Sequence, residues 1–204
     1  MIPPASTPLA AAVLAGGRSL RMGRDKAFLR WKGRRLIDCQ LTLLQSLEPA
    51  EIFISGRPGI DYGPTGVPVL YDDLPDAGPL GGIAALLGKI TAPHLLVLAV
   101  DMPAMTAKLL REIAARRESS RGVAPRLGGK WEPLAAVYPR ELAGNAKTRL
   151  ETGHRSLRNL VEEAVAGGRM RPYPVPPAQE QAFFNWNRLE EESLLRFPKM
   201  PPDT

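Results

Sequence analysis

The sequence predicts a single three-layer α/β domain built on a mostly parallel central sheet. Short apolar runs alternate with segments of helical periodicity through the first half of the chain, which is the order of elements in β-α-β units. The run His94–Val100 is almost entirely apolar, as expected for a central parallel strand that is covered on both faces. The length of 204 residues fits one domain, and neither an internal repeat nor a linker divides the sequence.

The elements of the first half follow from apolar periodicity and from the glycines and prolines that interrupt it. Strands are predicted at 9–14, 51–55, 69–71 and 94–100, and helices at 35–47, 83–90 and 106–117. Thr106 is expected to cap the last of these helices, because its hydroxyl can accept a hydrogen bond from a free backbone N–H group. Residues 28–33 are expected to form a short strand or turn, and the many glycines and prolines of 56–68 indicate a loop.

The second half of the chain predicts a hairpin, further helices and an edge strand. Two β-like segments, 122–126 and 132–138, are expected to flank a turn at 127–130. Prolines exclude 170–175 from the centre of a sheet, so this segment is predicted as an edge strand. Helices are predicted at 140–151, 156–166 and 189–196. The expected organisation is a disordered lead over 1–8, one domain over 9–197 and a proline-rich tail over 198–204.

Positive charge is concentrated in one short stretch. Residues 18–35 contain eight lysines and arginines and a single aspartate, so their net charge exceeds the formal +6 of the whole chain. Proteins that bind nucleic acid usually spread basic residues along a face or stripe. A single cluster indicates instead a compact and highly charged ligand, and no nucleic-acid partner is expected.

Cysteine content and apolar run lengths indicate the cellular compartment. Cys39 is the single cysteine, which excludes an intrachain disulfide and favours a reducing compartment. It is expected to be a buried residue of a helix and not a catalytic thiol. A membrane helix needs roughly 18 to 20 consecutive apolar residues, and no run approaches that length. The first eight residues also lack the features of a signal peptide, so we expect a cytoplasmic protein without a membrane partner.

A glycine-rich, basic loop follows the first predicted strand. Gly16 and Gly17 have no Cβ atom and adopt positive φ readily, so several backbone N–H groups of the loop can point at phosphate oxygens. Four cations surround that point: Arg18, Arg21, Arg24 and Lys26. The loop matches neither the G-x-G-x-x-G dinucleotide fingerprint nor the G-K-[ST] ending of a P-loop. We therefore predict a nucleotide polyphosphate site outside these two common classes.

Polar residues follow several of the predicted strands. Ligands of open α/β sheets bind beyond the carboxyl ends of the strands, which places the glycine-rich loop, Ser55, Asp72 and Asp101 on one edge. Asp101 ends the most apolar strand, and Mg²⁺ prefers one or two carboxylates together with phosphate oxygens and waters. The alternative is that Asp101 only caps the Asp-Met-Pro turn. With the glycine-rich loop on the same edge, we favour the metal role.

Three motifs resemble those of one family. Residues 14–26 resemble the signature L-A-G-G-x-S-x-R-M-G-x-D-K of the molybdenum cofactor guanylyltransferases, which have a nucleotide-diphosphosugar transferase-like fold. Residues 72–82 resemble the second motif of this family, D-x-x-x-x-x-G-P-L-x-G. Residues 184–187 are similar to its F-x-N-x-N segment, although the Thr-Pro that usually follows is absent here.

The resemblance implies a Mg²⁺-dependent transfer of GMP from GTP to the phosphate of molybdopterin or its molybdenum form, with release of pyrophosphate. It implies catalytic roles for Arg21, Lys26 and Asp101, with Asp101 as the metal ligand. The implied nucleotide-binding residues are Leu14, Ala15, Gly16, Gly17, Lys26, Ser55, Asp72 and Asp101. The implied acceptor-binding residues are Asn185, Asn187 and Arg155. Cofactor-delivery proteins are further expected partners.

Three alternative functions remain open at this point. Sister families that use CTP on molybdopterin have L-A-A-G where this chain has L-A-G-G, so Gly16 favours guanine over cytosine. A sugar-1-phosphate nucleotidyltransferase would keep the reaction and change the acceptor. A regulatory protein that has lost catalysis would bind the nucleotide without releasing pyrophosphate.

Overall fold

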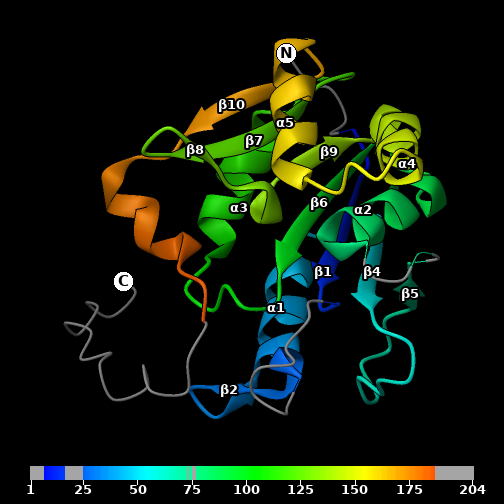
Figure 1. The fold of residues 1–204 in the computed structure, drawn as a ribbon. Coiled ribbons are helices and arrows are strands. Elements are labelled where there is room, and N and C mark those ends of the chain that lie inside the picture. The colour runs from blue at the N-terminus through cyan, green and yellow to red at the C-terminus, as the bar shows by residue number, and fades with distance from the viewer. Residues whose placement is uncertain (1–6, 17–24, 73, 75–76, 187–204) are drawn as a thin grey trace.

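The central sheet has the predicted, mostly parallel character (Figure 1). The computed structural model describes residues 7–16, 25–72, 74 and 77–186. The strand order is β10-β7-β9-β6-β1-β4-β5, and β8 pairs with β7. The strands are β1 (Leu9–Leu14), β4 (Glu51–Gly56), β5 (Val69–Tyr71), β6 (His94–Ala99), β7 (Gly122–Leu127), β8 (Lys130–Trp131), β9 (Val137–Pro139) and β10 (Met170–Pro174). β1 runs parallel to both β4 and β6, and β5 runs parallel to β4, so their carboxyl ends share one edge.

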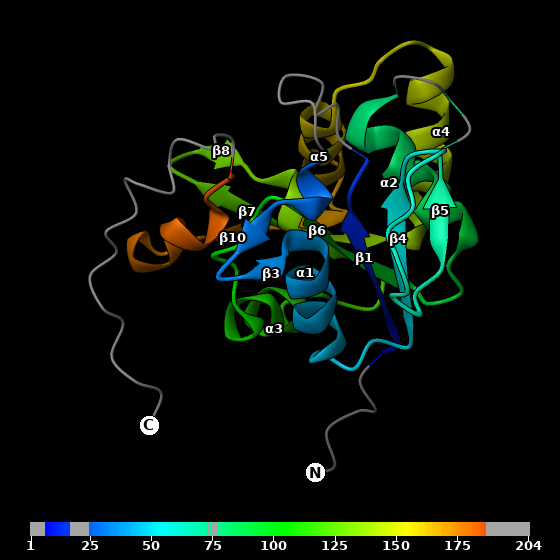
Figure 2. The same cartoon turned by 90° about the horizontal axis from the view of Figure 1, so that it is seen from below.

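Helices cover both faces of this sheet. They are α1 (Leu36–Gln45), α2 (Gly78–Lys89), α3 (Ala107–Ala115), α4 (Ala143–Glu151) and α5 (Leu157–Ala166). Figure 2 shows α1 and α3 on one side of the sheet and α2, α4 and α5 on the other. Side chains alternate along a strand, and in β1 Ala11 and Val13 join the core under α1 and α3, while Ala10 and Ala12 join the core under α2 and α5. The three-layer prediction is confirmed. No described helix is long and apolar enough to cross a membrane.

Several local predictions are confirmed. β1 and β5 have the predicted bounds. The hydroxyl of Thr106 caps α3 by accepting a hydrogen bond from the Leu109 N–H group at 3.2 Å. A hairpin forms at the predicted place, but its turn is Gly128–Gly129 and its second strand is β8 in place of the predicted 132–138. β10 lies at the edge of the sheet, as predicted. Its prolines have no N–H group, and at an edge this absence interrupts no hydrogen bonding between central strands.

The structure corrects the predicted start of the second helix, residues 83–90. α2 begins at Gly78, because Pro79 stands in its first turn, where the missing N–H group costs nothing. Residues 78–82, Gly-Pro-Leu-Gly-Gly, therefore form about the first turn and a half of the helix. This places the helix N-terminus at the carboxyl ends of β4 and β5.

Two segments of the second half also differ from the prediction. The strand predicted over 132–138 shortens to β9, because Pro133 opens a 3-10 turn, η2 (Pro133–Ala135). β9 runs antiparallel to β6, so β6 has one parallel and one antiparallel neighbour. The predicted helix 140–151 begins with a 3-10 turn, η3 (Arg140–Leu142), before α4. The helix predicted at 189–196 and the tail lie outside the described residues.

The expected short element at 28–33 is a hairpin that stands apart from the main sheet. It follows the 3-10 turn η1 (Lys26–Phe28) and consists of β2 (Arg30–Trp31) and β3 (Arg34–Arg35). Its two turn residues, Lys32 and Gly33, have φ of 48° and 81°, as the tightest hairpin turns require.

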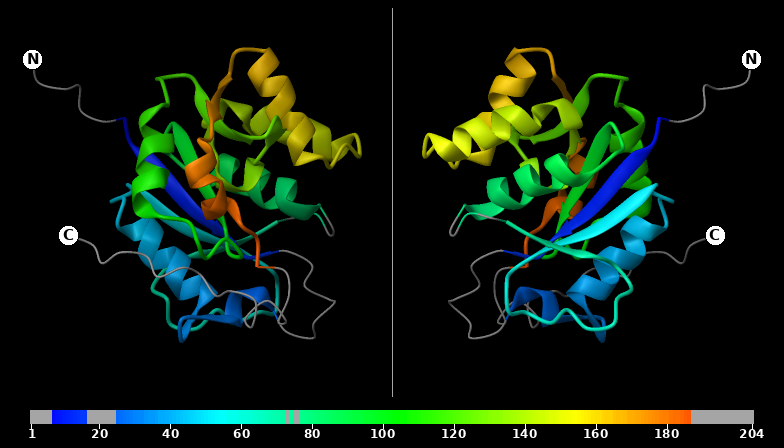
Figure 3. Two further views of the ribbon diagram at one scale, coloured as in Figure 1. Left: turned by 90° about the vertical axis from the view of Figure 1, so that its left-hand side faces the viewer. Right: turned by 90° about the vertical axis from the view of Figure 1, so that its right-hand side faces the viewer.

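A last segment returns along the sheet to the edge that carries the strand ends. The 3-10 turn η4 (Pro177–Phe183) passes beside α3 (Figure 3). Gln179 Nε2 donates a hydrogen bond to Glu112 Oε2 of α3 at 3.0 Å. Beyond η4, residues 184–186 form neither a helix nor a strand.

Candidate active site

A cavity lies at the carboxyl ends of β1, β4, β5 and β6, where the sequence places the ligand. Its lining contains seven residues predicted for the site: Leu14, Ala15, Gly16, Lys26, Ser55, Asp72 and Asp101. The lining also includes Gly78, Pro79 and Gly82 from the start of α2, and Leu134 from η2. Leu134 was not predicted, because nothing in the sequence around it indicates a ligand.

The remaining predicted residues are not among those that line the cavity. Gly17, Arg21 and Asn187 lie outside the described residues. Arg155 is exposed on the turn between α4 and α5, and the structure does not bring it to the cavity. Asn185 follows η4, next to a residue that contacts Asp101.

Lys26 and Asp101 meet in the cavity although 75 residues separate them. Lys26 Nζ donates to Asp101 Oδ2 at 2.7 Å, and their side chains are 25% and 16% exposed. Lys26 extends from η1, whose N-cap is the carboxylate of Asp25, which accepts from the Ala27 N–H group at 3.0 Å. The other oxygen of Asp25 binds Arg57 Nη2 at 2.9 Å. Because the Asp25 side chain is only 4% exposed, this pair ties the segment that carries Lys26 to the end of β4.

The backbone beside the Asp101 carboxylate is held from two directions. The Trp186 N–H group donates to the Asp101 carbonyl at 2.7 Å, and Gln40 Nε2 of α1 donates to the Met102 carbonyl at 2.7 Å. The sequence-based prediction missed Gln40. A polar residue on the buried face of a predicted amphipathic helix is the signal that could have found it, since buried amides need partners.

The start of α2 packs closely against the end of β4. A Cβ atom on Gly82 would come closer to the Ser55 hydroxyl than any van der Waals contact allows, and Ser55 is buried. The absence of a side chain at this position therefore lets the helix N-terminus approach the cavity, where its free N–H groups favour an anion.

Replacing Gly82 with Ala is expected to lower the melting temperature and to weaken nucleotide binding, because the clash moves either Ser55 or α2. Gly88→Ala in the same helix is the matched control, since a Cβ atom there meets nothing within 4 Å. Gly88→Ala is expected to leave nucleotide binding unchanged and to raise the free energy of unfolding by up to about 1 kcal/mol, because alanine has the higher helix propensity. Thermal melts and nucleotide titrations of both variants check this. Equal melting temperatures and affinities for the two variants would contradict the steric argument.

The residues of the cavity fit a hard cation that is shared with phosphate. Among the residues the structure describes, no three His, Cys, Asp or Glu side chains lie close enough together to hold a metal ion. These residues therefore do not provide a complete set of protein ligands for a metal. Asp101 presents one carboxylate to the cavity. This donor set suits Mg²⁺, which takes one or two carboxylates and completes its shell with phosphate oxygens and waters.

Cys39 does not contribute a nucleophile to this site. It lies on α1 and is not among the residues that line the cavity. Burial raises the pKa of the Cys39 thiol, which disfavours the reactive thiolate. Cys39 lies on a helix, as expected, but it is only partly buried.

Comparisons with known proteins agree on one family. A family model for the MobA-like NTP transferase domain matches residues 11–168. The chain is 36% identical over 194 residues to a protein of Opitutus terrae described as "Probable molybdenum cofactor guanylyltransferase", covering 94% of this chain and 96% of the relative. It is 37% identical over 161 residues to the molybdenum cofactor guanylyltransferase of Pseudomonas fluorescens, covering 76% and 80%.

A solved structure shares the fold. The crystal structure of molybdopterin-guanine dinucleotide biosynthesis protein A from Archaeoglobus fulgidus matches with a TM-score of 0.72 at 22% identity, covering 91% of this chain and 95% of that chain. The family model and the two curated relatives show that the chain is a nucleotidyltransferase. The chain belongs to the MobA-like NTP transferase domain family. The resemblance seen in its motifs is confirmed.

Proposed function

We propose that this chain transfers GMP from GTP to the terminal phosphate of molybdopterin, or of its molybdenum form, and releases pyrophosphate. The observation that carries the proposal is the Lys26–Asp101 pair in a cavity that is also lined by Leu14, Ala15 and Gly16 at the end of β1. The relatives named molybdenum cofactor guanylyltransferase support the identity of donor and acceptor. Proteins that deliver the acceptor are further proposed partners.

The nucleotide would be held mainly by backbone groups. Leu14, Ala15 and Gly16 present the end of β1 to the cavity, with Ser55 and Asp72 on the side of β4 and β5. The first turn of α2 adds backbone N–H groups that have no acceptor within the helix and can donate to the ribose and the base. We assign the triphosphate to β1 and the following loop, and the ribose and base to the start of α2.

The reaction needs no covalent enzyme intermediate. An oxygen of the acceptor phosphate attacks the α-phosphorus of GTP in line, the bond between the α-phosphorus and the bridging oxygen breaks, and pyrophosphate leaves with that electron pair. The attacking phosphate is already anionic, so no general base is required. Catalysis then consists of positioning and charge neutralisation. Lys26 would neutralise charge at the α-phosphate and the leaving pyrophosphate, and Arg21 is proposed to assist it.

Asp101 would hold Mg²⁺, which supplies charge neutralisation to the phosphate oxygens when it is bound. The hydrogen bonds from Trp186 and Gln40 to the neighbouring carbonyls keep this carboxylate directed into the cavity. On the acceptor side, Asn185 is the proposed contact within the described part of the chain. Asn187 and Arg155 are proposed with it from the family resemblance.

Titration with each nucleoside triphosphate in the presence of Mg²⁺, followed by thermal melting, tests the proposal. GTP at about a hundredfold excess over its Kd is expected to stabilise the protein by about 2.7 kcal/mol, with ATP, CTP and UTP giving much smaller shifts. Pyrophosphate release should then require molybdopterin as well as GTP. Selective stabilisation by CTP would indicate a cytidylyltransferase, and release with a sugar 1-phosphate would indicate a different acceptor. GTP binding without any release would indicate a regulator.

A further inference from the structure

Two tryptophans from opposite ends of the chain pack against each other close to Asp101. Trp31 lies on β2 of the separate hairpin, and Trp186 follows η4. Their ring centroids are 5.0 Å apart and their planes are inclined by 84°, which is the edge-to-face arrangement that aromatic pairs prefer. Trp186 is 4% exposed. The hairpin therefore covers the segment that leads into the acceptor side of the site.

Trp186 connects two parts of the active site. Its backbone N–H group donates to the Asp101 carbonyl at 2.7 Å, so the position of Trp186 is linked to that of the proposed metal ligand. The preceding residue, Asn185, has a buried amide oxygen with no hydrogen-bond partner in the part of the chain that the structure describes. A buried acceptor without a donor requires an explanation. Asn185 is not among the residues that line the cavity, so its place on the acceptor side rests on the family resemblance.

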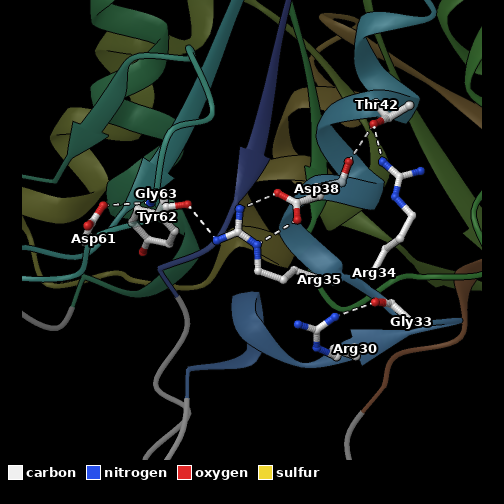
Figure 4. A network of polar contacts seen from close by, with 9 residues as sticks. All are labelled: Arg30, Gly33, Arg34, Arg35, Asp38, Thr42, Asp61, Tyr62 and Gly63. Carbon is white, nitrogen blue, oxygen red and sulfur yellow. Dashed lines mark hydrogen bonds and ion pairs between the residues drawn. The ribbon is translucent and has the colours of Figure 1, made fainter.

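The hairpin that carries Trp31 is anchored without help from Trp186. Arg35 forms two hydrogen bonds of 2.7 Å with Asp38 on α1, and Arg34 Nη2 donates to Thr42 Oγ1 at 3.0 Å (Figure 4). Arg30 Nη1 closes the turn on the Gly33 carbonyl at 2.6 Å. Because these contacts attach the hairpin to α1, Trp31 is the fixed member of the aromatic pair and Trp186 is the member that it holds.

We propose that Trp31 is a positioning residue for the acceptor side of the active site. By packing on Trp186, it keeps Asn185 and the Asp101 carbonyl in one arrangement, so that the acceptor phosphate meets the nucleotide in line. The nucleotide is held from the other side, by Gly16, Ser55 and Asp72. Loss of Trp31 therefore affects use of the acceptor directly, and it affects the nucleotide only through the metal that Asp101 would hold. The inference rests on the proposed function for the identity of the acceptor, but not for the packing itself.

Steady-state kinetics of Trp31→Ala and Trp31→Phe test the role in catalysis. Trp31→Ala is expected to raise the KM for molybdopterin and to lower kcat, each by about tenfold, because small displacements of positioning groups are costly. The Kd for GTP, measured without acceptor and without Mg²⁺, should change by less than about twofold, since Gly16, Ser55 and Asp72 are unchanged and Asp101 would reach the nucleotide through the metal. Trp31→Phe keeps an aromatic ring and should restore most of the acceptor use.

Trp131→Ala is the matched control. Trp131 also lies on a two-residue strand of a hairpin, β8, and also has a cation over its ring, with Arg126 Cζ 5.1 Å from the centroid. For Trp31 the corresponding cation is Lys32, whose Nζ lies 5.9 Å from the ring centroid. The control variant should leave the ratio of acceptor KM to GTP Kd unchanged. An equal loss for donor and acceptor in Trp31→Ala, or no loss for either, would overturn the proposal.

Acrylamide quenching of tryptophan fluorescence tests the packing without any substrate. The chain has three tryptophans, so Trp31→Ala combined with Trp131→Phe leaves Trp186 alone. We expect strong quenching in this variant and weak quenching of Trp186 when Trp31→Phe replaces Trp31→Ala in the same background. Equal quenching in the two variants would show that Trp31 does not hold Trp186. Because this measurement needs no turnover, failure of the GMP-transfer proposal and failure of the positioning role are distinguishable.

Discussion

Replacing Asp101 with Asn is expected to abolish turnover while leaving the fold intact. The substitution keeps the shape of the side chain and removes the charge that would hold the metal, so kcat should fall by about a thousandfold or more. Folding should change little, because the backbone of Asp101 and Met102 stays bound to Trp186 and Gln40. Initial rates of pyrophosphate release over a range of Mg²⁺ concentrations, together with a thermal melt, check both parts.

Glu163→Gln is the control for the removal of one paired carboxylate. Glu163 Oε1 accepts from Arg149 Nη1 at 2.6 Å, and neither residue is among those that line the cavity. This variant should keep normal turnover. If Asp101→Asn also keeps nearly normal activity with Mg²⁺, Asp101 is not the metal ligand and its role is limited to capping the turn after β6.

Replacing Lys26 with Ala is expected to lower kcat by about a hundredfold or more, with a smaller effect on the affinity for GTP. Charge that develops on the transferring phosphate is stabilised by a cation held in place before the reaction, and this stabilisation is lost in the transition state more than in the ground state. Lys26 is well placed for this role, because η1 and the Asp25–Arg57 pair fix the backbone from which it extends. Comparing kcat with the Kd for GTP separates the two effects.

Lys108→Ala removes a lysine from the exposed face of α3 and controls for the loss of one positive charge. It should leave both kcat and GTP affinity unchanged. If Lys26→Ala weakens only the affinity for GTP and kcat stays near the wild-type value, Lys26 binds the nucleotide but does not stabilise the transition state.

Much of the nucleotide side of the site was predictable because it depends on local sequence. Apolar runs determine where β1, β4, β5 and β6 end, and the geometry of a parallel sheet brings those ends to one edge. Residues at or just beyond these strand ends, Gly16, Ser55, Asp72 and Asp101, therefore had to lie together, and they do. The family motifs then indicate nucleotidyl transfer, and the comparisons confirm the family.

The contacts around Trp186 were less predictable because they join segments that are distant in sequence. Periodicity reports which face of an element is buried, but it does not report which distant residue covers that face. The start of α2 was also missed, for a local reason. The helix begins at Gly78 and not at the predicted residue 83, because Pro79 is tolerated in its first turn and Gly82 packs closely against Ser55.

The sequence by itself determined the fold class, the family and the edge of the sheet at which the cavity lies. Only the tertiary structure decided that Lys26 meets Asp101, that Gln40 holds the carbonyl of Met102, and that Trp31 packs on Trp186. It also decided that Arg155 lies outside the cavity lining. The physical reason is that these pairings arise from packing between elements far apart in the chain, whereas strand ends and motifs are encoded within a few neighbouring residues.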